Sequence, residues 1–297
     1  MRLVRYEGSD GVARLGALTD QGVINLEAAA RILGLPASPF TEMSSFLSAG
    51  EGAIDQAQKL IHSIPQGTLV PLADVKLRAP VPHPGKIIAV GLNYKDHSME
   101  SGAKEPPKTP ILFAKFNNSI SGPGDPIEIP AGDKQVDYEA ELAVVIGRKG
   151  KGIPASKASQ YIAGYMPLND VSARTWQFAD KQWVRGKSCD TFCPIGPCLT
   201  TRDDVPNPHT LAISARVNGN TLQNSNTAKM IFHIPELIEF ISGSGITLEP
   251  GDIIATGTPE GVGVFRKPPI FLKPGDVVEI EIEKLGVLRN PVVAGEA

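Results

Sequence analysis

Residues 137–147 read Asp-Tyr-Glu-Ala-Glu-Leu-Ala-Val-Val-Ile-Gly, and this stretch is the one around which the chain is organised. From Leu142 onward it is apolar and closes at Gly147, a pattern typical of a short strand buried on both faces. Glu139 and Glu141 precede the run, and positions i and i+2 of a strand project from the same face. Two carboxylates beside a buried strand must take up a proton or be matched by a cation. Two such glutamates on their own usually lie at the solvated rim of an edge strand. Whether they form a functional site therefore depends on which other residues lie near them.

The composition is that of an ordinary globular protein. Hydrophobic residues make up 41% of the 297 residues and charged residues 21%, with a net charge of −3. That balance offers no basic surface for nucleic acid or for an anionic membrane. No apolar stretch is long enough to span a bilayer, and the first residues show no signal-peptide core. Three cysteines are too few for a disulfide scaffold and indicate a reducing compartment, so we expect a cytoplasmic protein.

The three cysteines follow the spacing C-x3-C-x4-C at Cys189, Cys193 and Cys198. Structural zinc sites favour paired C-x2-4-C knuckles and a fourth ligand, and no histidine lies close by in the sequence. We interpret the cysteines as incidental buried thiols.

Residues 1–80 are predicted to form a small N-terminal α/β accessory domain. Short apolar runs alternate with glycine-rich turns, which favours antiparallel strands at 3–6, 12–18 and 23–26. Helical patterns follow at 26–33, 41–50 and 53–64, with Thr41 as a candidate N-cap. The connector at 79–85 contains three alternating prolines, and we place the domain boundary there.

Residues 81–297 are predicted to form the larger, strand-rich domain. Strands are expected at 86–90, 111–115, 161–168, 211–217, 252–255 and 277–282, with a helix at 235–242. Asn218-Gly219 is a hairpin signal. The fold class is therefore α+β, mainly β.

Several polar groups lie at strand ends and on short helices of this second domain. His97 and Glu100 are i, i+3 neighbours on a helix predicted to begin after Asn93 and to end at Gly102, where the carboxylate can orient the imidazole as an acid–base dyad. On a short helix such a pair is more often a solvated surface feature. Asp170 follows a strand and supplies a third carboxylate.

Four further residues offer donors for an anionic substrate. Arg174 and Gln177 stand one helical turn apart, and Lys187 follows in Gly-Lys-Ser. Thr258 lies in the turn Thr-Gly-Thr-Pro-Glu-Gly-Val-Gly at 256–263, which can present a hydroxyl and backbone N–H groups to an anion. A phosphate loop is excluded because the chain has no G-x4-G-K-[ST].

The order of five motifs resembles the fumarylacetoacetate hydrolase superfamily. These are N-Y-x-x-H-x-x-E, D-Y-E-x-E-L-A-V-V-I-G, N-D-V-S-A-R-x-x-Q, G-K-S-x-D-T and D-I-I-x-T-G-T-P-x-G-V-G, and the resemblance covers about residues 81–297. The closing segment at 263–276 looks most like the domain-containing protein 2 branch of that family.

The resemblance implies a mixed β-roll fold, usually dimeric, with a divalent cation at its mouth. It assigns three groups of residues: metal ligands Glu139, Glu141 and Asp170; catalytic residues His97, Glu100 and Lys187; and substrate-binding residues Arg174, Gln177 and Thr258. Thr175 departs from the family pattern, since relatives often carry aspartate there. We interpret that position as a support for Arg174.

The resemblance and the ligand types together indicate metal-assisted chemistry on a small 2-keto acid. Three carboxylates suit Mg²⁺ or Mn²⁺, which can stabilise an enolate as a Lewis acid. We expect C–C bond hydrolysis of acylpyruvate- or fumarylpyruvate-type 2,4-diketo acids. Decarboxylation or keto–enol tautomerisation of oxaloacetate is the alternative, and a non-catalytic metabolite-binding homologue is a third possibility. The protein is expected to be a homodimer without nucleic acid or membrane partners.

Overall fold

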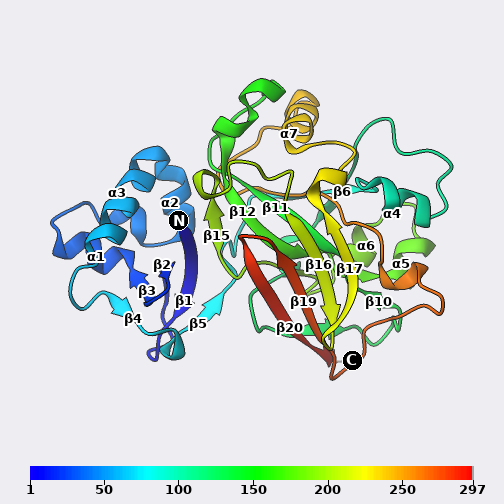
Figure 1. Ribbon diagram of the computed structural model, residues 1–297, viewed down its shortest axis with the longest axis horizontal. Helices are drawn as coiled ribbons and strands as arrows, with labels where there is room; N and C mark the ends of the chain where they lie inside the picture. The colour runs from blue at the N-terminus through cyan, green and yellow to red at the C-terminus, as the bar shows by residue number, and fades with distance from the viewer. Residues whose placement is uncertain (296–297) are drawn as a thin grey trace.

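A computed structural model describes residues 1–295 and shows a smaller N-terminal part beside a larger strand-rich part (Figure 1). The two parts share one sheet of 11 strands, because β1 pairs antiparallel with β15 at Arg2 and Thr200. In order the strands are β4 (Leu69–Val70), β3 (Gly22–Asn25), β2 (Ala13–Thr19), β1 (Arg2–Glu7), β15 (Leu199–Thr201), β12 (Ile162–Asn169), β11 (Ala140–Ile146), β18 (Ile253–Ala255), β6 (Ile87–Gly91) and β7 (Ile111–Lys115), with β5 (Lys76–Arg78) paired to β1. Strands from both sides of the predicted domain boundary at residue 80 therefore belong to one sheet, and that boundary stays a prediction.

A second sheet of five strands forms the other wall of the larger part. Its order is β17 (Asn220–Asn226), β16 (Ala212–Val217), β19 (Val277–Ile282), β20 (Gly286–Ala294) and β9 (Ile127–Ile129). Two short pairs complete the strands: β10 (Val136–Asp137) with β13 (Ser172–Ala173), and β8 (Ile120–Ser121) with β14 (Cys193–Pro194). The predicted mainly-β α+β class is confirmed.

Strand β11 lies between two hydrophobic cores, which explains its unbroken apolar sequence. Leu142, Val144 and Ile146 contribute to the core shared with β16 and β19. Ala143 and Val145 belong to a second core, which includes residues of the N-terminal part such as Phe40. Alternate residues of a strand face opposite sides, so both faces of β11 must be apolar.

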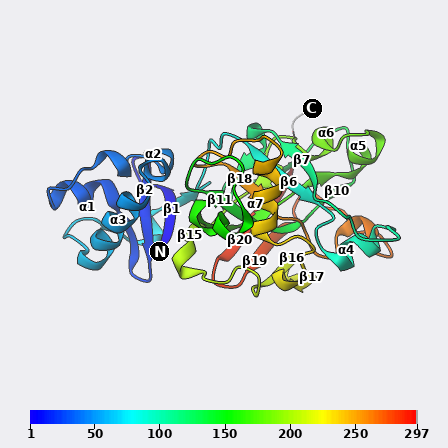
Figure 2. The ribbon, with the colours of Figure 1, turned by 90° about the horizontal axis from the view of Figure 1, so that it is seen from above.

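The helices lie at the outside of these sheets (Figures 1 and 2). They are α1 (Leu26–Ile32), α2 (Met43–Ala49), α3 (Glu51–Ser63), α4 (Lys95–Glu100), α5 (Arg174–Ala179), α6 (Val184–Lys187) and α7 (Ile234–Gly243). Seen from above, α7 crosses the region of β11 and β18, and it buries Leu237, Ile238 and Ile241.

Two predicted helix caps are wrong. The N-cap of α2 is Glu42 instead of Thr41. Helix α4 starts one residue later than expected, with Tyr94 at its N-cap position. The Asn93 side-chain amide instead donates to the carbonyl oxygens of Phe232 and Thr256, at 3.0 and 2.7 Å. These hydrogen bonds connect the start of α4 to two segments that are distant in the sequence.

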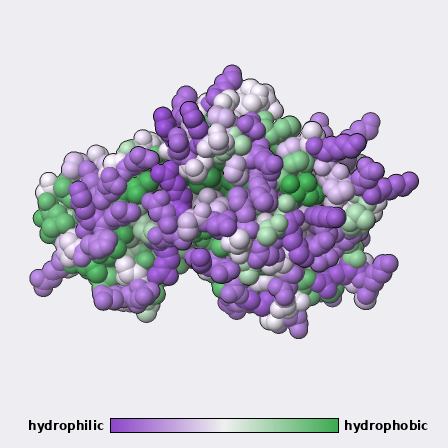
Figure 3. All heavy atoms as spheres, turned by 45° about the horizontal axis from the view of Figure 1, so that its top comes forward, coloured by the Kyte–Doolittle hydropathy of each residue, from purple (hydrophilic) through white to green (hydrophobic). Residues whose placement is uncertain are grey.

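Hydrophilic side chains cover most of the face seen in Figure 3, with small hydrophobic patches between them. Within residues 1–295, no helix has both the length and the apolar character needed to cross a membrane.

Candidate active site

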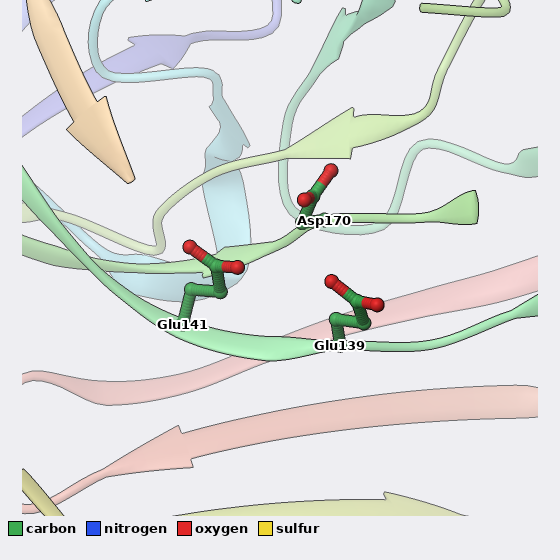
Figure 4. A group of neighbouring side chains, drawn as sticks. All are labelled: Glu139, Glu141 and Asp170. Carbon is green, nitrogen blue, oxygen red and sulfur yellow. The ribbon is translucent and has the colours of Figure 1, made fainter. Parts of the chain in front are cut away.

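Three carboxylates meet where β11 and β12 lie side by side (Figure 4). Glu141 belongs to β11, Glu139 directly precedes that strand, and Asp170 directly follows β12. The strand ladder fixes their approach, because the backbone N–H of Asp170 donates to the carbonyl of Glu139 at 2.9 Å. The Asn169 side chain accepts from the backbone N–H of Glu139 at 3.0 Å. One oxygen from each carboxylate lies within 4.8 Å of the other two.

Glu139 is fully paired with cations. Its carboxylate accepts from Lys187 Nζ at 2.7 Å and lies 2.7 Å from the Arg174 guanidinium. Burial alone would raise the pKa of Glu139, but the charges of Lys187 and Arg174 outweigh burial and lower it. Glu139 is therefore an anion in the folded protein.

Glu141 has no such cation partner. It is 1% exposed and accepts one hydrogen bond, from the backbone N–H of Gly257 at 2.8 Å, and no basic residue within 1–295 forms an ion pair with it. Burial and the nearby charges of Asp170 and Glu139 raise its pKa well above the usual range. A buried carboxylate without a cation, facing two others, matches the oxygen-only ligand set of a hard divalent ion.

Gly257 is adapted to hold Glu141 in place. Its backbone has φ of +100°, and a Cβ there would come within 2.7 Å of the Asn93 side chain. Only glycine adopts this conformation without strain. A glycine at position 257 is therefore needed to place the backbone N–H that donates to Glu141.

The lysines form a buried group around Asp170. Lys187 donates to one carboxylate oxygen at 2.7 Å and Lys115 to the other at 2.6 Å. Lys115 also donates to the backbone carbonyl of Lys187. Sequence reasoning missed Lys115, although a lysine closing an otherwise apolar strand was a usable signal.

Arg174 is held by Asp137 and Gln177, and not by position 175 as the sequence had suggested. Its Nε donates to Asp137 at 2.9 Å and its NH1 donates to the Gln177 side-chain oxygen at 2.8 Å. Asp137, which sequence reasoning also missed, further accepts from the backbone N–H groups of Gly263 and Val264 at 2.8 and 3.0 Å. It thereby links Arg174 to the loop after β18.

The interpretation of Thr175 as a support for Arg174 is wrong. Its hydroxyl donates to Asp133 at 2.9 Å, and the backbone N–H of Trp176 also donates to Asp133, at 3.2 Å. Thr175 therefore secures the start of α5 to the loop before β10.

His97 and Glu100 form the predicted contact on α4. Nδ1 of His97 lies 2.8 Å from a Glu100 carboxylate oxygen. The same carboxylate accepts from the backbone N–H of Gly261 at 3.0 and 3.1 Å, which ties the dyad to the loop after β18. The imidazole is buried and lies 6.2 Å from the Phe265 ring, centroid to centroid.

A cavity of about 280 Å³ joins these groups. Thr258 lies at its wall and accepts from the Gln223 amide at 2.8 Å, which leaves its own hydroxyl proton available to a ligand. Glu100 is set behind His97, and the other predicted site residues all line the cavity: His97, Glu139, Glu141, Asp170, Arg174, Gln177, Lys187 and Thr258.

The chain also matches a known family over most of the larger part. Residues 86–293 match the family described as fumarylacetoacetate (FAA) hydrolase C-terminal. The chain belongs to the fumarylacetoacetate hydrolase family. The predicted resemblance is confirmed, and this fumarylacetoacetate hydrolase family member is an enzyme.

Two relatives of this fumarylacetoacetate hydrolase family member are named oxaloacetate tautomerases. The protein from Xenopus laevis is 47% identical over 99% of this chain and 90% of its own length. The protein from Rattus norvegicus is 52% identical over 87% of this chain and 81% of its own length. Both are named mitochondrial, so the prediction of a cytoplasmic location is wrong. Cysteine content indicates whether a protein works in an oxidising or a reducing compartment, but it does not identify which reducing compartment that is.

A solved structure adds a metal to the comparison. Maleylpyruvate hydrolase from Sphingobium sp. SYK-6, in complex with manganese(II) and pyruvate, superimposes with a TM-score of 0.79 at 33% identity and covers 100% of both chains. The fumarylacetoacetate hydrolase family is metal-dependent, and the acidic cluster of this member has the donor set such an ion requires.

Proposed function

We propose that this enzyme interconverts the keto and enol forms of oxaloacetate or a similar 2-oxo acid, with Mg²⁺ or Mn²⁺ held by Glu139, Glu141 and Asp170. The main support for this proposal is Glu141. Its carboxylate is buried, has no cation partner and faces two further carboxylates. The names of the similar relatives favour tautomerisation over the C–C bond hydrolysis that the sequence led us to place first.

A divalent ion at these carboxylates supplies a Lewis acid that stabilises the enolate of a 2-oxo acid. Lys187 adds positive charge beside the same carboxylates, since its Nζ contacts Glu139 and Asp170. Burial would lower the pKa of Lys187, but these two carboxylates outweigh it and raise the pKa, so the ammonium stays charged.

Substrate orientation falls to Gln177 and Thr258, with Arg174 held between Asp137 and Glu139. The Gln177 amide oxygen is bound to Arg174, which leaves its NH₂ group for a substrate carboxylate. Thr258 offers a hydroxyl proton from the turn after β18.

Proton transfer falls to His97. Its Nδ1 is held by Glu100, so Nε2 is the ring nitrogen free to take the proton from C3 of the keto form. The enolate oxygen then takes up a proton to give the enol, and the reverse steps restore the keto form. Glu100 keeps the ring in that orientation through its bonds to Gly261.

Hydrolysis of a maleylpyruvate- or acylpyruvate-type acid is the second candidate. The observation that favours it is the same dyad, because an oriented imidazole can also act as a general base towards water. The solved neighbour named maleylpyruvate hydrolase supports this candidate.

One set of assays separates the candidates. Purified enzyme is given enol-oxaloacetate and an acylpyruvate with Mg²⁺ or Mn²⁺, while the enol absorbance and pyruvate release are followed together. Fast loss of the enol without pyruvate release supports tautomerisation, and pyruvate release from the acylpyruvate supports hydrolysis. Pyruvate release from oxaloacetate identifies decarboxylation.

Static light scattering on the same preparation tests the homodimer that was predicted from the sequence.

A further inference from the structure

Four aromatic residues line the cavity, and the sequence motifs gave no indication of them. Phe113, Phe178, Trp183 and Phe265 all line the cavity. Trp183 packs edge-on against Phe113, with ring centroids 5.3 Å apart and an interplanar angle of 72°. A Cβ at Gly91 would come within 2.4 Å of the Trp183 ring, so the indole lies directly against bare backbone.

Two of these rings, Phe113 and Phe265, lie beside the reacting groups. The ammonium of Lys187 lies 5.3 Å from the centroid of the Phe113 ring. Phe265 packs beside His97. Phe178 is 58% exposed while lining the cavity, so part of its ring is free to contact a ligand. A 2-oxo acid bound beside Lys187 would therefore lie next to the Phe113 ring.

Each basic side chain that lines the cavity, among the described residues, already contacts a carboxylate of the protein. Among the described residues that line it, the basic ones are His97, Arg174 and Lys187. Arg174 and Lys187 each contact two carboxylates of the protein, and His97 contacts Glu100. A planar apolar group on C3 needs no cation of its own and gains from packing against aromatic rings.

We propose that the enzyme also interconverts the enol and keto forms of 2-oxo acids that carry an aromatic ring on C3, the arylpyruvates. This inference rests on the proposed function, because it uses the same metal ligands and the same proton-transfer residue. The reaction is balanced without a co-reactant. The enol O–H bond breaks, a C3–H bond forms, and the C=C bond is exchanged for a C=O bond with no change in oxidation state.

The test compares the enol forms of phenylpyruvate and oxaloacetate with the metal-loaded enzyme and two phenylalanine variants. Phe178→Ala removes an exposed ring that lines the cavity. Phe116→Ala is the matched control, because Phe116 is 57% exposed and does not line it. An aromatic contact of this kind is worth up to about 1.5 kcal/mol, or about tenfold. We expect Phe178→Ala to lower kcat/KM for phenylpyruvate by about that factor and for oxaloacetate by less, and Phe116→Ala to change neither.

The outcomes separate the inference from the function it rests on. If oxaloacetate is turned over and phenylpyruvate is not, the arylpyruvate inference is wrong and the proposed function stands. If neither is turned over, the proposed function itself fails. Equal losses on both substrates in Phe178→Ala would also overturn the inference, because the ring would then not distinguish aromatic substituents.

Binding gives a second readout that does not depend on turnover. The chain has two tryptophans, so Trp176→Phe leaves Trp183 as the only indole. Phenylpyruvate should quench the fluorescence of Trp183 in a saturable way, with free tryptophan as the control for absorbed light. Pyruvate, which has no ring, should produce a much smaller change. Similar curves for the two acids would contradict a contact between the substrate ring and the aromatic residues around Trp183.

Discussion

The ammonium of Lys115 lies 2.6 Å from the Asp170 carboxylate, and both side chains are fully shielded from solvent. Lys115 ends β7, Asp170 follows β12, and a second bond from Lys115 reaches the backbone of Lys187 at the end of α6. One buried lysine thus joins three elements around a proposed metal ligand.

Lys115→Met should destabilise the protein and weaken its hold on a divalent ion. Removing one partner of a buried ion pair costs up to about 3–5 kcal/mol when the remaining charge is left unpaired, and Lys187, which still contacts Asp170, should keep the loss towards the lower end. Urea unfolding should show this loss, and titration with Mn²⁺ followed by electron paramagnetic resonance should show weaker binding. Lys149→Met is the control, since its pair with Glu249 is exposed and worth at most about 1 kcal/mol. Equal effects of the two substitutions would contradict a bracing role for Lys115.

Removal of the divalent ion should abolish activity. Chelator-treated enzyme is expected to be inactive and to recover when Mg²⁺ or Mn²⁺ is returned, because three buried carboxylates supply the site. Glu141→Gln keeps the shape of the side chain and removes a charged ligand, so it should lower both ion binding and turnover by at least tenfold. Glu260→Gln, a change at an exposed glutamate of the neighbouring turn, serves as the control. Full activity in metal-stripped protein would refute the assignment.

His97→Ala should slow tautomerisation of oxaloacetate and hydrolysis of an acylpyruvate by about a hundredfold or more, the usual scale of a general base. Decarboxylation of oxaloacetate should be less affected, since Lys187 and a bound divalent ion would stabilise the enolate in that reaction. Rates on the two substrates, measured side by side with product analysis, provide the comparison. His62→Ala, a change at an exposed histidine of α3, is the control. Equal collapse of all three reactions would show that His97 mainly holds α4 in place.

His209 should make the protein less stable as the pH falls from about 6.5 towards 4. Its ring stacks on His233 with centroids 4.4 Å apart, and it accepts from the backbone N–H of Ile234 at 3.1 Å. Burial, followed by the charge of His233, lowers the pKa of His209 to about 4, against a smaller opposite effect of Glu236. In this window the unfolded chain binds a proton that the folded protein does not, so stability is lost as the pH falls.

The midpoint of urea unfolding at pH 7 and pH 5 measures this effect. His209→Asn should reduce the difference between the two midpoints, whereas His62→Asn on exposed α3 should leave it unchanged. An unaltered difference in His209→Asn would place the pH response elsewhere in the chain.

The sequence by itself predicted the fold class, the buried strand β11 and most of the residues that the structure brings together around the cavity. These depend on local regularities: an apolar run buried on both faces, two glutamates spaced to share a face, and a histidine and glutamate one helical turn apart. Five ordered motifs then identified the family, and the family match covers residues 86–293.

Only the tertiary structure decided what holds these residues in place. Lys115 meets Asp170 across 55 positions of sequence, and Asp137 meets Arg174 across 37. Phe113 and Trp183 pack edge-on from separate elements, and β1 joins the main sheet through residues near 200. Contacts of this kind leave no repeat or fixed spacing in the chain, because the folded backbone alone brings their partners together.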